Sequence, residues 1–188
     1  GYNDKGEVKP IGESKIEDAK LICKLGALNN EAHLEKEGKK WVSFGDSIDI
    51  AFLSLAKKID VDYTDEVLEI IPYESENQYS AVFYKKDGET YCTVKGSLEK
   101  VMSFSEKKQT YIDQNEELTG KGYRVIAIAE GKVKGTTVED IKKLNFIGMV
   151  GFIDPIRVEV KDSLKECDAA GIKVVMITGD HPLTAYAI

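Results

Sequence analysis

The fold is decided by Tyr79-Ser-Ala-Val-Phe-Tyr-Lys-Lys-Asp-Gly-Glu-Thr-Tyr-Cys-Thr-Val94. Two runs rich in β-branched and aromatic residues, 79–84 and 89–94, flank the pair Asp87-Gly88, which is typical of a two-residue hairpin turn. Further strands are expected at 67–72, 123–129 and 145–152. Consecutive strands joined by hairpins favour an antiparallel sheet. We therefore predict an α+β fold, an antiparallel sheet flanked by helices.

Apolar residues at helical spacing predict the flanking helices. A first helix begins near Ser14, and a second begins after Asp46 or Ser47, either of which is a suitable N-cap. The apolar stripe of the second helix consists of Ile48, Ala51, Phe52, Leu55 and Ile59. Helical patterns also cover 96–104 and 107–121, and Gly122 then stands where a helix C-cap glycine is expected.

The pattern changes at Asp154-Pro-Ile-Arg157, so we divide the chain into domains at 1–153 and 154–188. In the second part, Val160, Leu164 and Cys167 form a helical stripe. The segment 173–177 that follows contains a continuous apolar run, 174–177, which is typical of a strand buried on both faces of a parallel sheet. Ligands bind at the carboxyl ends of such strands.

Thr178, Gly179 and Asp180 follow that run, and they are candidates for a phosphate site. Asp180 is also a good N-cap for a helix led by Pro182. Both readings are compatible, because a helix N-terminus binds anions.

The composition is that of a soluble globular protein, with 42% hydrophobic and 31% charged residues among 188. A net charge of -7 argues against a general nucleic-acid or anionic-membrane binder. Cys23, Cys92 and Cys167 lack metal-ligand spacing, and we expect reduced thiols in a cytosolic environment. The sequence contains neither a signal peptide nor an apolar run of membrane-spanning length.

Six short motifs follow one another in a fixed order. They are Gly45-Asp-Ser-Ile-Asp-Ile-Ala51, Pro72-Tyr-Glu-Ser-Glu76, Lys95-Gly-Ser-Leu-Glu99, Gly122-Tyr-Arg124, Asp154-Pro-Ile-Arg157 and Met176-Ile-Thr-Gly-Asp180. In this order they resemble the cytoplasmic region of P-type (E1-E2) cation-transporting ATPases, pumps that form an aspartyl-phosphate. The resemblance implies a nucleotide-binding domain at 1–153 and a hinge with part of an α/β haloacid dehalogenase-like phosphorylation domain at 154–188.

The resemblance also implies what the chain binds and where it works. It implies ATP as ligand, Mg²⁺ in the full-length parent, and the remaining phosphorylation, actuator and transmembrane domains as partners. The parent would be an integral membrane protein with this region on its cytoplasmic face. Its motifs are closer to those of calcium, sodium or proton pumps than to those of heavy-metal pumps, but they do not identify the ion.

The resemblance implies roles for several residues. Lys95 and Gly96 would line the ATP pocket, and Tyr73 would stack on adenine with its π-face. Asp49 stands where the family often has a glutamate that contacts the adenine amino group, and Arg124 would reach the phosphates. Each residue also has a structural reading: a solvated strand-end lysine, an edge-strand aromatic, a helix-dipole carboxylate and a surface arginine.

The family commonly carries basic residues a few positions after the aromatic one, where this chain has Ser75, Asn77 and Gln78. Because those cations attract phosphate, we expect this chain to bind ATP weakly, with a dissociation constant in the millimolar range, about -4 kcal/mol.

Asp154, Pro155 and Arg157 resemble the family's hinge, whose motion delivers ATP to the phosphorylated aspartate. Thr178 and Gly179 would hold the transferred phosphoryl group, and Asp180 would help to organise the cation site. The family's nucleophile motif Asp-Lys-Thr-Gly-Thr does not occur here. Since phosphoryl transfer needs nucleophile, metal and positioned phosphate together, we expect the fragment to bind nucleotide and to catalyse nothing.

Two other functions fit parts of the pattern. A soluble haloacid dehalogenase-type phosphatase would share the phosphate chemistry at the strand end and carry a cap domain. A non-catalytic interaction module would keep the fold without binding ATP. In the partial phosphorylation domain, whose central strand is missing, the strand at 173–177 would be unpaired, and we expect it to be a candidate for self-association.

Overall fold

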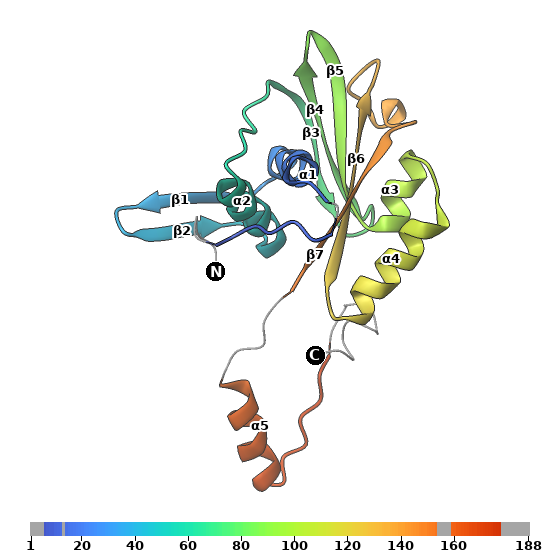
Figure 1. The fold of residues 1–188 in the computed structure, drawn as a ribbon. Coiled ribbons are helices and arrows are strands. Elements are labelled where there is room, and N and C mark those ends of the chain that lie inside the picture. The colour runs from blue at the N-terminus through green and yellow to red at the C-terminus, as the bar shows by residue number, and fades with distance from the viewer. Residues whose placement is uncertain (1–5, 13, 154–158, 178–188) are drawn as a thin grey trace.

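The computed structural model describes residues 6–12, 14–153 and 159–177. Its centre is a five-stranded antiparallel sheet in the order β3-β4-β5-β6-β7 (Figure 1). The strands are β3 (Val67–Glu74), β4 (Tyr79–Lys86), β5 (Glu89–Gly96), β6 (Arg124–Lys132) and β7 (Asn145–Phe152). The predicted α+β fold with an antiparallel sheet is confirmed.

The hairpin of β4 and β5 forms around the predicted turn. Asp87 and Gly88 have φ values of 53° and 79°, the left-handed conformations that a tight two-residue hairpin turn requires. Both strands extend two residues beyond the predicted ends, so that Tyr79 pairs with Gly96 at the far end of the hairpin.

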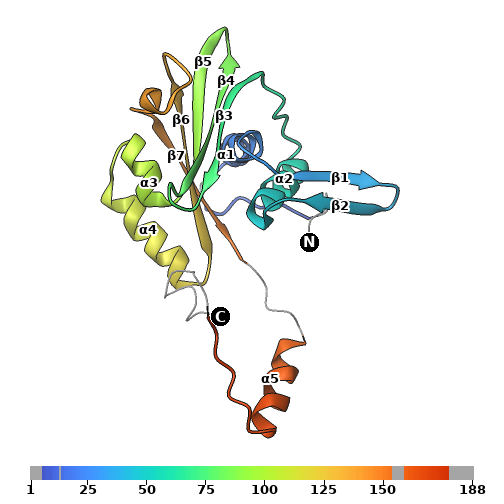
Figure 2. The ribbon, with the colours of Figure 1, turned by 180° about the vertical axis from the view of Figure 1, so that it is seen from behind.

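Helices cover both faces of the sheet. In Figure 1, α1 (Ile16–Leu28) and α2 (Ser47–Ile59) lie to the left of the sheet, and α3 (Leu98–Phe104) and α4 (Gln109–Gly120) lie to the right. Figure 2 shows the same arrangement from behind. A short 3-10 turn, η1 (Val138–Asp140), lies between β6 and β7.

Alternation along the strands divides the core into two layers. Phe83 belongs to a cluster with α3, whereas its neighbours Val82 and Tyr84 belong to a cluster with Leu25 of α1 and Phe52 of α2. This follows from the two-residue period of a strand, which sends successive side chains to opposite faces.

Helix α2 begins as predicted but is buried on a wider surface. The Asp46 side chain caps it by accepting a hydrogen bond from the Ile48 amide at 2.8 Å. Besides the predicted Phe52 and Ile59, the structure buries Ile50 and Leu53. These residues are covered by a β-hairpin that packs against α2 and that the sequence pattern does not predict. It consists of β1 (His33–Glu37) and β2 (Lys40–Phe44).

Two aromatic rings connect α2 to the end of the sheet. Phe52 is fully buried, and its ring lies edge-on to that of Phe152, with centroids 4.9 Å apart. Phe152 is the last residue of β7, so the point where the chain leaves the sheet is packed against the middle of α2.

The second part of the chain lies apart from the sheet (Figure 1). Helix α5 (Val160–Ala169) forms as predicted but buries none of its residues. The prediction of a buried strand at 173–177 is wrong: the segment belongs to no strand, and Ile177 is 94% exposed. A strand needs a neighbour to satisfy its backbone, and no described residue pairs with this segment.

Several predictions fall outside the described residues. They are the hinge residues Asp154, Pro155 and Arg157 and the phosphate-site residues Thr178, Gly179 and Asp180. The domain division after residue 153 stays a prediction. Within the described ranges, no helix is both long and apolar enough to cross a membrane.

Candidate functional site

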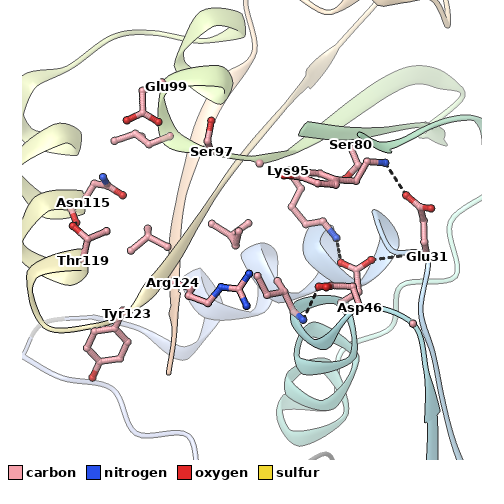
Figure 3. A pocket seen from close by; sticks show the side chains of 18 residues that line it. Glu31, Asp46, Ser80, Lys95, Ser97, Glu99, Asn115, Thr119, Tyr123 and Arg124 are labelled. Atoms are coloured by element: carbon pink, nitrogen blue, oxygen red, sulfur yellow. Dashed lines mark hydrogen bonds and ion pairs between the residues drawn. The ribbon is translucent and has the colours of Figure 1, made fainter. Parts of the chain in front are cut away.

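A cavity of about 660 Å³ opens where β5 ends, β6 begins and α2 starts. Figure 3 shows side chains of the sheet, the α2 start and the α3–α4 side gathered around it. Its lining consists of Glu31, Gly45, Asp46, Ile48, Asp49, Tyr73, Ser80, Lys95, Gly96, Ser97, Leu98, Glu99, Asn115, Thr119, Tyr123, Arg124, Val125 and Ile126.

The cavity brings together most of the residues that were predicted to surround the nucleotide. Those that line it are Asp49, Tyr73, Lys95, Gly96 and Arg124. The other two, Ser75 and Gln78, do not line it. Gln78 instead lies at the turn before β4, where its carbonyl accepts a hydrogen bond from the Ser97 amide at 3.1 Å.

Lys95 is a buried cation, so its reading as a solvated lysine is wrong. It is 7% exposed, and its Nζ donates hydrogen bonds of 2.5 Å to the Asn29 carbonyl and to Asp49 Oδ1. Burial lowers the pKa of Lys95 below its usual value, and the negative charge of Asp49 opposes that shift. Asp49 and Lys95 thus form a buried ion pair in the wall of the cavity.

Asp49 is engaged through both carboxylate oxygens. Besides the Oδ1 contact with Lys95, its Oδ2 accepts a hydrogen bond from the Glu31 amide at 3.1 Å. Its backbone carbonyl accepts from Asn30 Nδ2 at 2.9 Å. The carboxylate therefore holds the loop after α1 against the first turn of α2, in addition to neutralising the lysine.

Glu31 connects this cluster to Tyr73. The Tyr73 amide donates a 2.9 Å hydrogen bond to Glu31 Oε1, and the Tyr73 side chain remains 56% exposed on the edge strand β3. Glu31 carries no sequence signal for this role, because it is 42 residues away from Tyr73 and lies in a loop without periodic pattern.

Asn29 anchors the end of α1 beneath the cavity. It is 2% exposed, its Nδ2 donates to the carbonyls of Ser80 and Thr93, and its Oδ1 accepts from Ser80 Oγ at 2.8 Å. Its own carbonyl accepts from Lys95. The sequence signal for such an anchor is weak: an asparagine directly after a predicted helix.

Gly96 is required by strand pairing. A Cβ at this position would lie 2.3 Å from the Gln78 carbonyl oxygen and 2.8 Å from Tyr79 Cα. Since these are backbone atoms, a larger residue would push the two strands apart. The structural reason for glycine is thus the close crossing of β4 and β5 at the cavity.

The charges around the cavity are predominantly acidic. Four carboxylates, those of Glu31, Asp46, Asp49 and Glu99, face two cations, Lys95 and Arg124. Arg124 extends into the cavity from the start of β6, toward the side on which Asp46 lies (Figure 3). An aromatic face, a neutralised ion pair and one planar guanidinium are suited to an aromatic ligand with an attached anionic group.

Comparison with known proteins identifies relatives over the whole chain. Residues 18–159 match the family described as P-type ATPase, cytoplasmic domain N. The cation-transporting ATPase pma1 of Synechocystis sp. is 33% identical over 219 aligned positions, and the calcium-transporting ATPase of Bacillus subtilis is 31% identical over 220. Both alignments cover 100% of this chain and 24% of the relative.

A third relative also aligns with most of this chain. The sodium/potassium exporting P-type ATPase cta3 of Schizosaccharomyces pombe is 31% identical over 190 positions, covering 89% of this chain and 18% of the relative. The chain therefore spans about a quarter or less of the length of these curated relatives.

Proposed function

Since the chain belongs to the P-type ATPase cytoplasmic N-domain family, we propose that its cavity binds ATP for a cation-transporting ATPase. The relatives are named for cation, calcium or sodium/potassium transport, and the transported ion of the parent protein stays open. The parent would be a membrane enzyme that hydrolyses ATP, with this region on the cytoplasmic side.

One observation carries the proposal. Five residues that the sequence motifs single out, spread from position 49 to position 124, line one cavity of about 660 Å³. That volume lies within the range of small-molecule sites. The exposed ring of Tyr73 would stack on adenine, and the Arg124 guanidinium would contact the phosphates as a planar donor.

The cavity residues do not fit a protein-held Mg²⁺. Among the described residues, no three His, Cys, Asp or Glu side chains are grouped so that they could hold a metal ion. In this proposal the chain contributes the nucleotide pocket, and the nucleophile for phosphoryl transfer lies in another part of the pump.

The two alternatives differ from this proposal in measurable ways. The family match over 18–159 concerns a pump domain and favours the pump over a soluble phosphatase. An interaction module would keep the fold, but ATP would leave the NMR signals of Tyr73, Lys95 and Arg124 unchanged.

The test is an NMR titration of the whole chain with ATP. We expect shifts confined to the cavity residues and a dissociation constant of about 1 mM, because acidic side chains outnumber cations there. Tyr73→Ala should weaken binding about tenfold, as expected for the loss of one stacking contact.

The matched control is Ile70→Ala. Ile70 is also on β3 and is 47% exposed, but it does not line the cavity. The proposal fails if ATP produces no localised shifts at 10 mM, a concentration about tenfold above the expected constant, or if both variants weaken binding equally.

A further inference from the structure

The inference concerns how the cavity distinguishes one nucleobase from another, and it rests on the proposed function. By family resemblance, the residue at position 49 would accept from the adenine amino group. In this chain Asp49 already neutralises Lys95 through Oδ1 and holds the Glu31 amide through Oδ2. A ligand amino group that approached it would be a third partner for a carboxylate whose position two contacts already fix.

Glu31 offers a carboxylate in a better place. Its Oε1 accepts the Tyr73 amide at 2.9 Å, which fixes the carboxylate beside the aromatic residue on which a base would stack. Glu31 is exposed and lines the cavity. A base stacked on Tyr73 would therefore have this carboxylate near its edge.

The other carboxylates of the cavity are less suitable. Asp46 caps α2 by accepting from the Ile48 amide at 2.8 Å. Glu99 is in the first turn of α3, and Figure 3 shows it across the cavity from Glu31, on the side of Asn115 and Thr119. Of the four, Glu31 is the one that is bonded to the backbone of Tyr73.

We propose that Glu31 is the residue that selects bases with an exocyclic amino group. An ionised carboxylate only accepts hydrogen bonds. It would bond the 6-amino group of adenine and would repel the 6-carbonyl oxygen of hypoxanthine. A site that pairs with a donor discriminates against an analogue that presents an acceptor at the same place, because the hydrogen bond is lost and two oxygens face each other.

The experiment compares ATP with ITP, in which a carbonyl oxygen replaces the 6-amino group and N1 carries a hydrogen, by NMR titration of the whole chain and of Glu31→Gln. Glutamine keeps an oxygen for the Tyr73 amide and adds an NH₂ donor. We expect the unmodified chain to prefer ATP about tenfold, the value of one charge-assisted hydrogen bond. In Glu31→Gln the preference should fall to about one or reverse, because the amide NH₂ can bond the carbonyl of ITP.

Glu99→Gln is the matched control. It makes the same chemical change in the same cavity, on the opposite side, and should leave the ATP preference unchanged. An unchanged pattern of amide signals outside the cavity shows that each variant is folded.

The outcomes separate the inference from the function. If neither nucleotide binds the unmodified chain, the proposed function and the inference both fail. If both bind and the ATP preference persists in Glu31→Gln, or falls equally in Glu99→Gln, the cavity binds nucleotide but Glu31 does not select the base.

Discussion

Helices α2 and α5 have similar sequence patterns and opposite surroundings. Both carry an apolar stripe at helical spacing, Phe52 and Ile59 in α2 and Val160 and Leu164 in α5. Phe52 is 0% exposed, whereas Leu164 is 45% exposed and no residue of α5 is buried. A periodic pattern therefore determines which face of a helix is apolar, and the rest of the fold determines whether that face is covered.

The difference arises from what each helix meets. Helix α2 is enclosed by the sheet, by α1 and by the β1–β2 hairpin, so it is buried on two sides. The described residues provide no comparable cover for α5. Helix α2 also supplies Asp49 to the cavity, so its packing and the geometry of the candidate site depend on each other.

The largest expected effect is on the free energy of unfolding. Phe52→Ala should lower it by about 3–5 kcal/mol, because a large ring is removed from a fully buried position. Leu164→Ala should change it by about 0.5 kcal/mol or less, since Leu164 is 45% exposed and the described residues bury no side chain of α5. Urea denaturation followed by circular dichroism measures both. Equal losses in the two variants would show that α5 is as well covered as α2.

A smaller loss of stability is expected from a substitution where α1 packs closely against α2. A Cβ added at Gly26 would lie 2.3 Å from the Phe52 ring, so Gly26→Ala should cost about 1–3 kcal/mol of stability through overpacking. A Cβ added at Gly120, in α4, would meet none of these neighbouring atoms within 4 Å. Gly120→Ala should be neutral or slightly stabilising, because alanine favours a helix. A destabilisation of the Gly120 variant as large as that of the Gly26 variant would contradict this account.

The smallest effect is a chemical one and leaves the fold intact. Burial raises the pKa of the Cys23 thiol to about 11 and that of Cys92 to about 12. At pH 8 only about one Cys23 in a thousand and one Cys92 in ten thousand is then a thiolate, the reactive form. Cys167, in α5, is partly exposed.

A thiol reagent at pH 8 should therefore modify Cys167 first and leave the other two unmodified on the same timescale. Mass spectrometry of the digested chain identifies the site. All three cysteines should react in denaturant. Labelling of Cys92 at the rate of Cys167 in the folded chain would show that the sheet opens far more readily than its packing suggests.

The sequence was sufficient for the elements whose pattern is local. The β4–β5 hairpin follows from Asp87-Gly88, and the start of α2 follows from Asp46, because each is determined by neighbouring residues. The β1–β2 hairpin was missed, since His33–Glu37 is mostly charged and buries only Leu34. The prediction of a strand at 173–177 was wrong for the opposite reason. The composition of this segment suits a strand, but a strand forms only where a neighbouring strand pairs with it.

In the candidate site, too, some residues follow from a local sequence pattern and others depend on contacts between distant parts of the chain. Tyr73, Lys95 and Arg124 line the cavity, and they could be singled out because their motifs stand in a recognisable order. Glu31 and Asn29 were not found, because their roles depend on contacts across 42 and 51 residues. The burial of Lys95 against Asp49 likewise arises only when α2 and β5 come together.

The contact between the Phe52 and Phe152 rings couples the wall of the cavity to the end of the sheet. Lys95 Nζ lies 5.4 Å from the centre of the Phe52 ring, and Phe52 in turn touches Phe152. An ammonium group in the wall of the cavity and the last residue of the sheet therefore belong to one packed unit. A change in the position of Lys95 would therefore alter the packing of Phe52 and, through it, that of Phe152 at the end of β7.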